Sequence, residues 1–448
     1  MTSPPAPRRL RVLVIAEAAN PEWVSVPLVG WSLAAALREK ADVHIVTQLR
    51  NRGAFLRAGL VEGQDFTAID SEAVARPVYR LAERLRLGEG RGWTIHTAII
   101  SRMAYPYFER LVWRQFRDRL KARAFDIVHR ITPLTPTANS SLAPRCARLG
   151  VPFILGPLNG GVPWPPGFER ERWREREMLS YLRAFYRFSP ARIRMLSASR
   201  VIIAGSRATA AEIPARHRNK VVHMPENGID PARFRRIASP PTGLPLRGVF
   251  IGRLVPYKGP DMLIEAARPF LRDGRLVLDI VGSGPMKAAL RRQTSEAGLD
   301  GAVRFHGWVA HDQVQDVLAQ AHLLTFPSIR EFGGGVVLEA MATGVVPVIC
   351  DYAGPAELAD ETCCFKVPMG DRASVIAAFR ATLGRILDDP DCLAPLARNG
   401  LQKVTRHYTW ERKAQQIVNI YRWALNPQGP IPAHPYGAHE GSGAPALT

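Results

Sequence analysis

The feature that most constrains the fold is an alternation of short apolar runs with longer helical stretches in the second half of the chain. A strand, a helix and a second parallel strand join through a right-handed crossover, so this order predicts a parallel sheet covered by helices. The ligand crevice of such a sheet lies beyond the carboxyl ends of its strands. The expected strands are GVFIG, LVLDIVG, VRFHG, HLLTFPS and VPVIC, and the expected helices span 260–272, 285–298, 311–321, 336–343 and 371–388.

The first half shows a similar order. The expected elements are the strand RVLVIAE, a helix from Val29 to Arg38, the strand DVHIVT, the strand DIVHR, a helix from Pro136 to Leu149, and the strands PFILG and RVIIAGS. A run rich in proline and glycine from Asn227 to Gly248 separates the halves. A chain of 448 residues, 46% of them hydrophobic, is long enough for two cores. We therefore predict an α/β protein in which two Rossmann-like domains face each other across a cleft.

The predicted limits follow from these patterns. Residues 1–235 form a first Rossmann-like domain, which carries a basic, aromatic-rich insertion, and residues 236–405 form a second Rossmann-like domain. A helix at 406–425 is expected to pack across the domain junction, and residues 426–448 are expected to form a disordered tail.

Cysteine usage and hydropathy bear on the compartment. The five cysteines are an odd number without zinc-ligand spacing, and they are too few to staple a chain of this length. We interpret them as reduced and expect a cytoplasmic protein. No stretch reaches the roughly 18 uncharged apolar residues of a membrane span, so any membrane contact would be peripheral, on the inner face.

Positive charge is concentrated in two stretches of the first half. The formal net charge is +20; twelve Lys and Arg against four acids lie between Arg76 and Arg123, and nine Arg against four Glu lie between Phe168 and Arg200. Both stretches carry interleaved aromatic residues, which suits an anionic membrane surface. Solvated helical faces explain the charge equally well. No recognition-helix, zinc-finger or RNP pattern is present, so we expect no nucleic-acid partner.

A glycine loop is the most informative local motif. The segment SIREFGGGVVLEAMATG, residues 328–344, sets three glycines between a strand and a helix. Glycines allow the backbone to approach a ligand, and the helix start offers N–H groups to an anion. Glu331 and Glu339 can both accept hydrogen bonds from the hydroxyls of one bound sugar or ribose. A tight turn with two surface glutamates is the alternative interpretation.

Two cations follow the first strand of the second domain. The loop IGRLVPYKG carries Gly252, Arg253 and Lys258. If this loop lines the same crevice, the cations would meet a diphosphate and stabilise it as a leaving group without a metal; solvated loop cations are the alternative. We expect no cofactor and no metal, and we interpret VGSGP as a close-packed turn and Asp389-Pro390-Asp391 as a polar turn.

Taken together and in this order, Arg253, Lys258, Glu331 and Glu339 resemble the family-4 retaining glycosyltransferases of GT-B fold, with a glycosyl transferases group 1 type C-terminal domain. The resemblance runs from 248 to 357 and includes VGSGP, FHGWV, FPS and AMATG, and it is weaker at PLVGWSLAAALRE and NGID in the first half. It implies that Arg253 and Lys258 bind the donor diphosphate, Glu339 the ribose and Glu331 the transferred sugar. The backbone of Gly333, Gly334, Gly335 and Val336 would hold sugar or phosphate.

The first domain departs from that pattern at one place. Many members of the family have two histidines separated by one residue, whereas DIVHRITP supplies His129 and has Ile131 in the second place. His129 is therefore either a catalytic group that donates to the sugar or an ordinary strand-end histidine. Other candidates for the donor or acceptor side of the cleft are Gly30 and, within GPLNGG, Asn159, Gly160 and Gly161.

The resemblance implies a metal-independent hexosyltransferase that moves a sugar from a nucleotide-diphosphate sugar to an acceptor with retention of configuration. The acceptor would be a glycan or a lipid-linked intermediate in glycan, glycolipid or surface-polysaccharide synthesis. Two alternatives stay open at this point: a nucleotide-sugar 2-epimerase-like enzyme, and a glycosyltransferase-like protein that binds without catalysing.

Overall fold

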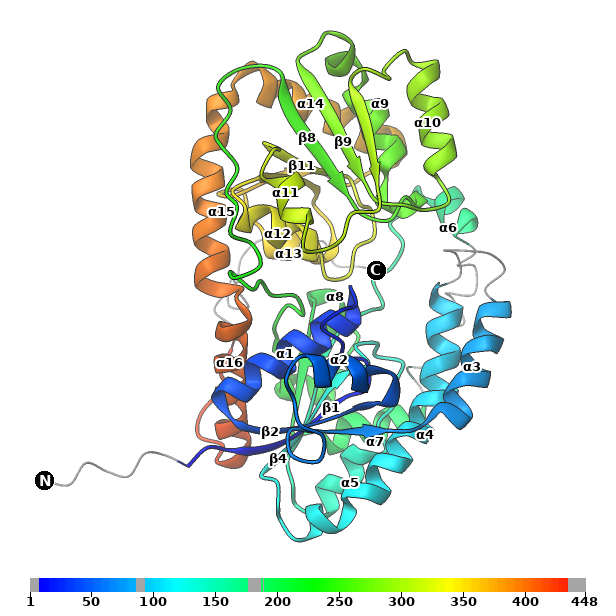
Figure 1. Ribbon diagram of the computed structural model, residues 1–448, viewed down its shortest axis with the longest axis vertical. Coiled ribbons are helices and arrows are strands. Elements are labelled where there is room, and N and C mark those ends of the chain that lie inside the picture. The colour runs from blue at the N-terminus through cyan, green and yellow to red at the C-terminus, as the bar shows by residue number, and fades with distance from the viewer. Residues whose placement is uncertain (1–7, 86–92, 176–186, 188, 434–448) are drawn as a thin grey trace, which may run out of the picture.

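The protein consists of two α/β domains stacked along its longest axis (Figure 1). The computed structural model describes residues 8–85, 93–175, 187 and 189–433. Within these residues one sheet has seven strands in the order β3-β2-β1-β4-β5-β6-β7, and the other has six in the order β10-β9-β8-β11-β12-β13. Every strand pair in both sheets is parallel. The predicted fold class is therefore confirmed.

The first sheet is buried between helices because its central strands are continuous apolar runs. Strand β1, for example, is RVLVIA and is buried at every position after Arg11. The strands are β1 (Arg11–Ala16), β2 (Asp42–Gln48), β3 (Phe66–Ile69), β4 (Ile127–Thr132), β5 (Phe153–Leu158), β6 (Val201–Ala204) and β7 (Val221–His223). The helices are α1 (Val26–Lys40), α2 (Arg52–Arg57), α3 (Glu72–Leu85), α4 (Trp93–Lys121), α5 (Leu142–Arg148), α6 (Glu169–Arg174), α7 (Pro190–Ala198) and α8 (Arg207–Ala211).

Helix α5 is shorter than the predicted helix from Pro136 to Leu149. Side chains from elsewhere bind the backbone of the missing turn: Arg130 donates from Nη1 to the carbonyl of Ala138 at 2.7 Å, and the buried Glu109 accepts from the amide of Ser141 at 2.5 Å. These contacts replace helical hydrogen bonds, so α5 begins only at Leu142.

The basic stretch from Arg76 to Arg123 forms most of the antiparallel pair α3 and α4. Its aromatic residues Tyr105, Phe108 and Phe116 are buried in the core of the first domain. The Lys and Arg side chains that the structure describes in this stretch are exposed, so the aromatics that suggested a membrane surface are in large part core residues. None of the helices in the described part of the chain is both long and apolar enough to span a bilayer.

The second domain follows its predicted pattern closely. Its strands are β8 (Leu246–Ile251), β9 (Leu276–Val281), β10 (Val303–Gly307), β11 (Leu323–Phe326), β12 (Val346–Cys350) and β13 (Phe365–Val367). Its helices are α9 (Pro260–Arg272), α10 (Lys287–Glu296), α11 (Val314–Leu318), α12 (Gly335–Ala342), α13 (Ala353–Leu358), α14 (Arg372–Asp388) and α15 (Leu393–His407). The five predicted strands and five predicted helices all form.

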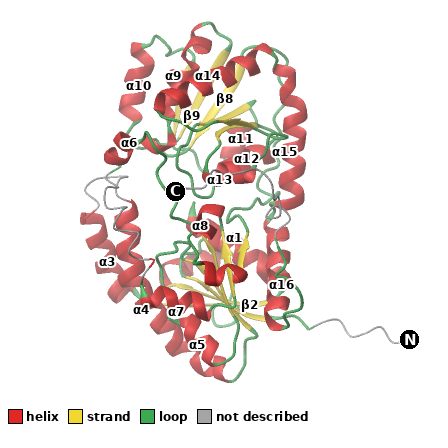
Figure 2. Cartoon of the chain, turned by 180° about the vertical axis from the view of Figure 1, so that it is seen from behind, coloured by secondary structure: helices red, strands yellow, loops and turns green. Residues whose placement is uncertain are grey.

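The C-terminal helices lie on different domains. Helix α15 packs against α12, whereas α16 (Trp410–Leu425) packs against α1 and places Ile417 and Tyr421 in the core of the first domain. The two helices run along one side of the molecule in both views (Figures 1 and 2). The chain therefore returns to the first domain at Tyr408 and Thr409. Of the predicted tail, residues 434–448 lie outside the described residues.

A segment of the first half, residues 161–174, packs against the second domain. Phe168 is fully buried in the core of the second domain. Arg330 donates from Nε to the carbonyl of Val162, and Tyr352 donates from its hydroxyl to the carbonyl of Pro163, both at 3.0 Å. The segment ends in α6, which lies against the second domain in Figure 1. The domains are thus linked by this arm as well as by the two chain crossings.

Candidate active site

The glycine loop lies where the carboxyl ends of the two sheets face each other. It runs from the end of β11 to the start of α12. Gly334, the residue before α12, has φ 60°, a left-handed conformation that favours glycine. A Cβ on Gly333 would lie 2.1 Å from Oε1 of Glu226, which belongs to the segment joining β7 to β8. A side chain at 333 would force Glu226 and Asn227 to shift, and the loop is therefore in close contact with the linker between the domains.

Lys258 and Glu331 meet in front of this loop. The Lys258 ammonium contacts Oε2 of Glu331, and it lies 4.9 Å from the ring centre of Phe326. Burial, and then the positive charge of Arg253, lower the pKa of Lys258 to about 7; the Glu331 carboxylate opposes that shift. The loop of the two predicted cations and the glycine loop therefore do line one site.

Glu339 lies on α12, one turn inside the helix. Its Oε1 is 2.9 Å from Nε2 of His311, and the ring of His311 contacts the edge of Phe234. Sequence analysis missed His311 because nothing in its neighbourhood distinguishes it from a surface histidine. The pair places a hydrogen-bonding carboxylate beside the N-terminal half of α12.

His129 is not at the surface of the site. Its side chain is fully buried on β4, with Nε2 2.6 Å from the carbonyl of Gly156 and Nδ1 2.6 Å from the hydroxyl of Tyr421. A carbonyl only accepts, so Nε2 carries the proton and Nδ1 accepts from the tyrosine. Burial lowers the pKa of His129 to about 4. This is the environment of a core histidine, and the hypothesis that it donates to the sugar is not met in this structure.

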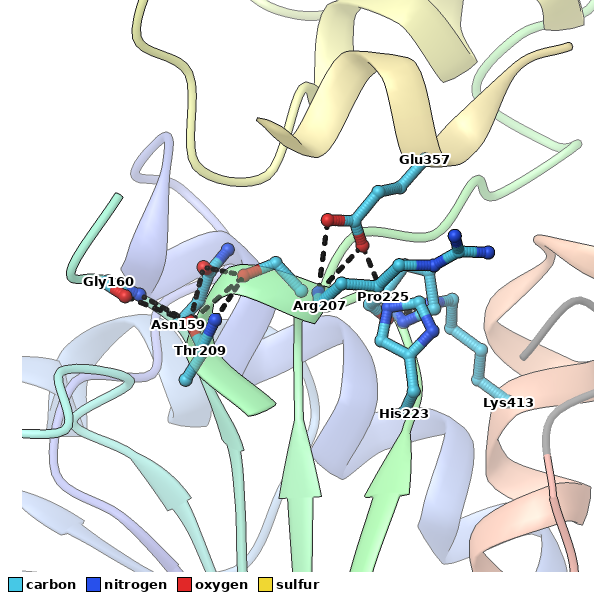
Figure 3. A network of polar contacts seen from close by, with 9 residues as sticks. Asn159, Gly160, Arg207, Thr209, His223, Pro225, Glu357 and Lys413 are labelled. Atoms are coloured by element: carbon cyan, nitrogen blue, oxygen red, sulfur yellow. Dashed lines mark hydrogen bonds and ion pairs between the residues drawn. The ribbon is translucent and has the colours of Figure 1, made fainter. Parts of the chain in front are cut away.

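The GPLNGG segment follows β5 and is fixed to the start of α8. Thr209 donates from its hydroxyl to the carbonyl of Gly160 at 2.9 Å, and Ser206 donates to Oδ1 of Asn159 at 3.3 Å (Figure 3). A Cβ on Gly161 would lie 2.4 Å from the carboxylate of Glu212. The candidate residues Asn159, Gly160 and Gly161 therefore form one rigid rim of the first domain.

Gly30 has a packing role in this structure. It lies on α1, where a Cβ would come 2.3 Å from the carbonyl oxygen of Ala18. The glycine lets α1 approach the loop that follows β1. Gly252, on the second domain, follows β8 and donates its amide to the carbonyl of Val281 on β9 at 3.0 Å.

One carboxylate joins the two domains beside the site. Glu357 on α13 accepts hydrogen bonds from the amide of Arg207, at 2.9 and 3.0 Å, and lies 2.9 Å from Nε2 of His223 (Figure 3). Both partners belong to the first domain, at the carboxyl ends of β6 and β7. Sequence analysis missed this contact because no local pattern reveals a partner 150 residues away.

Comparisons with known proteins agree with this geometry. Residues 246–385 match the family described as Glycosyl transferases group 1. The D-inositol 3-phosphate glycosyltransferase of Salinispora tropica is 32% identical over 231 residues, 46% of each chain. The alpha-D-kanosaminyltransferase of Streptomyces kanamyceticus is 28% identical over 39% of this chain and 45% of that protein. The chain thus spans about half the length of the curated relatives it matches.

Solved structures resemble nearly the whole chain. A glycosyltransferase from Rickettsia africae has a TM-score of 0.62 at 12% identity, covering 94% of this chain and 100% of that one. The Anabaena protein HepE in complex with UDP has a TM-score of 0.60 at 15% identity, covering 91% and 98%. Such likeness shows the fold. The second domain is therefore a glycosyl transferases group 1 domain, in a chain with the two-domain GT-B fold.

Proposed function

We propose that the chain is a retaining, metal-independent glycosyltransferase of hexosyltransferase type, which uses a nucleotide-diphosphate sugar as donor. The observation that carries the proposal is the meeting of Lys258 and Glu331 in front of the glycine loop, at the N-terminus of α12. One cation and one carboxylate at a helix start suit a ligand that joins an anion to a set of hydroxyls. A nucleotide-diphosphate sugar is such a ligand.

The donor diphosphate would replace Glu331 as the partner of Lys258. The ammonium already has a lowered pKa because of burial and Arg253, and two phosphates would restore its charge. The released Glu331 carboxylate would then accept hydrogen bonds from the transferred sugar. As the sugar leaves, negative charge grows on the phosphate, and Arg253, Lys258 and the start of α12 stabilise it. This is how the reaction would proceed without a metal.

Glu339 would bind the ribose. Its carboxylate has His311 on one side, at 2.9 Å, and keeps acceptor capacity for two hydroxyls. The backbone of Gly333 to Val336 would hold the sugar and phosphate through the N–H groups at the start of α12. Retention follows from the proposed front-face reaction, in which the departing phosphate takes the acceptor's proton and no protein nucleophile is needed.

The acceptor would bind to the first domain. We propose a glycan or lipid-linked acceptor and a cytoplasmic enzyme that attaches to an anionic membrane. The supporting surface is the outer face of α3 and α4, where Leu81 and Met103 are 43% and 51% exposed among arginines. Arg76, Arg80, Arg102, Arg110 and Arg114 are exposed on these helices. Flotation with anionic and neutral liposomes at rising salt tests this, and binding that ignores lipid charge would refute it.

A donor-release assay tests the catalytic proposal. The full chain is incubated with a panel of nucleotide-sugars and a mixed acceptor extract, and nucleoside diphosphate release is followed. Glu331→Ala and Lys258→Ala should each lower the rate at least about 100-fold, because each removes a group that acts on developing charge or on the sugar. Lys40→Ala, which breaks an ion pair between Lys40 and Glu411 on the first domain, is the matched control.

The outcomes separate the remaining alternatives. A rate of nucleoside diphosphate release that is the same in both site variants as in wild type would refute the proposal. An epimerase would convert the nucleotide-sugar into its C2 epimer without any acceptor product, and a binding protein would bind the donor without release. The anomeric configuration of the product, measured by NMR, tests retention, and unchanged rates in excess chelator test metal independence.

A further inference from the structure

Besides Glu331, a second carboxyl group lies against the glycine loop, on the side that faces the linker between the domains. It belongs to Glu226, in the segment between β7 and β8, and the residue is only 9% exposed. Its Oε1 occupies the space that a side chain at Gly333 would need. Its neighbour Asn227 lies as close to the same glycine, 2.3 Å from the position of a Cβ. The linker therefore forms one wall of the space in front of the loop.

Two groups of the first domain flank this carboxyl. Burial raises the pKa of Glu226 to about 7, and two groups oppose that shift: the side-chain amide of Asn159, directly after β5, and the charge of Lys413, on α16. The Lys413 ammonium, which is itself buried, donates to the carbonyl of Pro225 (Figure 3). Among the described residues, Oε2 of Glu226 has no hydrogen-bond partner that meets the usual geometry.

A buried carboxyl oxygen without such a partner destabilises the fold unless a ligand supplies the missing hydrogen bond. The unpartnered Oε2 of Glu226 lies beside the backbone of the glycine loop. Under the proposed function, that backbone holds the transferred sugar. A phosphate does not suit the ionised form of Glu226, because two anions would repel each other. A hydroxyl is complementary, since it donates to an ionised carboxylate and accepts from a protonated one.

We infer that Oε2 of Glu226 hydrogen-bonds a hydroxyl of the transferred sugar, so that the sugar lies between Glu226 and Glu331 at the two sides of the glycine loop. The inference rests on the proposed function and extends it, because it gives the linker between the domains a part in sugar recognition. The competing role is structural, in which Glu226 only neutralises Lys413 and anchors the linker to α16.

Binding measurements on the full chain separate the two roles. The dissociation constants of UDP and UDP-glucose, or of the base and sugar that the release assay selects, are measured by calorimetry for wild type, Glu226→Gln and Lys413→Met. The ratio of the two constants isolates what the sugar contributes. Glu226→Gln should leave nucleotide binding within about twofold and weaken nucleotide-sugar binding about 10-fold, because the sugar hydroxyl then bonds a neutral amide in place of a charged carboxylate. Lys413→Met should change both constants by the same factor.

An equal change of both constants in Glu226→Gln, or no change, would overturn the inference in favour of the structural role. If the glutamine variant does not fold, Glu226→Asp replaces it, because it keeps the charge and withdraws the carboxyl by one methylene. Wild-type protein that binds neither compound would overturn the proposed function and the inference together. Wild-type protein that binds both compounds, with a Glu226 variant that weakens both by the same factor, would overturn the inference alone.

Discussion

Lowering the pH from 7 to 4 should destabilise the protein through His129 by about 3 kcal/mol. The ring is fully buried and neutral, and its pKa of about 4 compares with an ordinary value of 6.5. Below pH 6.5 the unfolded chain binds a proton that the folded protein does not, so stability falls as the pH falls. The loss levels off near pH 4, where the folded form is also protonated. The difference in pKa, 6.5 minus 4, corresponds to about 3 kcal/mol.

His129→Gln isolates this contribution from those of other titrating groups. The glutamine amide can donate to the carbonyl of Gly156 and accept from Tyr421, as the imidazole does, but it does not titrate. Urea unfolding of both proteins is followed at pH 7, 6 and 5. Between pH 7 and pH 5 the wild type should lose about 2 kcal/mol more than the variant. If the free energies of unfolding of wild type and variant change in parallel across this pH range, the assignment of His129 as buried and neutral is refuted.

The same variant tests whether His129 takes part in catalysis. Its ring has both nitrogens occupied inside the first domain, so His129→Gln should retain the rate of nucleotide release at pH 7. A variant that folds with wild-type stability but releases no nucleotide would show that His129 reaches the donor in the working enzyme. The core role derived from this structure would then be wrong.

Three further predictions follow from contacts around the site. Tyr421→Phe leaves Nδ1 of His129 buried without a donor and should lower the free energy of unfolding by about 1–3 kcal/mol, measured by urea titration at pH 7; an unchanged midpoint would contradict it. Gly333→Ala should lower the melting temperature or donor affinity because its Cβ would meet a carboxylate 2.1 Å away, whereas Gly301→Ala, with open space around it, should change neither. Glu357→Ala removes hydrogen bonds between the domains and should raise the radius of gyration in X-ray scattering; superimposable profiles would rule this out.

Local patterns in the sequence are sufficient to predict most of the second domain. Each predicted strand is a short apolar run and each predicted helix a longer stretch between turn residues, and all ten form, although the pattern missed α13 and β13. The glycine loop and the cation loop were predicted to share one crevice because both follow strands of one parallel sheet. The contact between Lys258 and Glu331 agrees with that reasoning.

The first domain was less predictable because its decisive partners lie far apart in the chain. The predicted helix at 136 begins at Leu142 because Glu109 and Arg130 bind the backbone before it. The aromatics of the basic stretch looked equally suited to a membrane and to a core, and the fold buries Tyr105, Phe108 and Phe116.

The sequence by itself determined the α/β class, the two domains and the glycine loop between β11 and α12, because these depend on residue spacing within a few turns of chain. Only the tertiary structure decided which polar groups meet. His129 became a core residue because Tyr421, 292 residues away, returns on α16 to cover it. Glu226 reached the glycine loop because the linker folds against the second domain. Such contacts depend on how two domains pack together, and no spacing in the sequence records that.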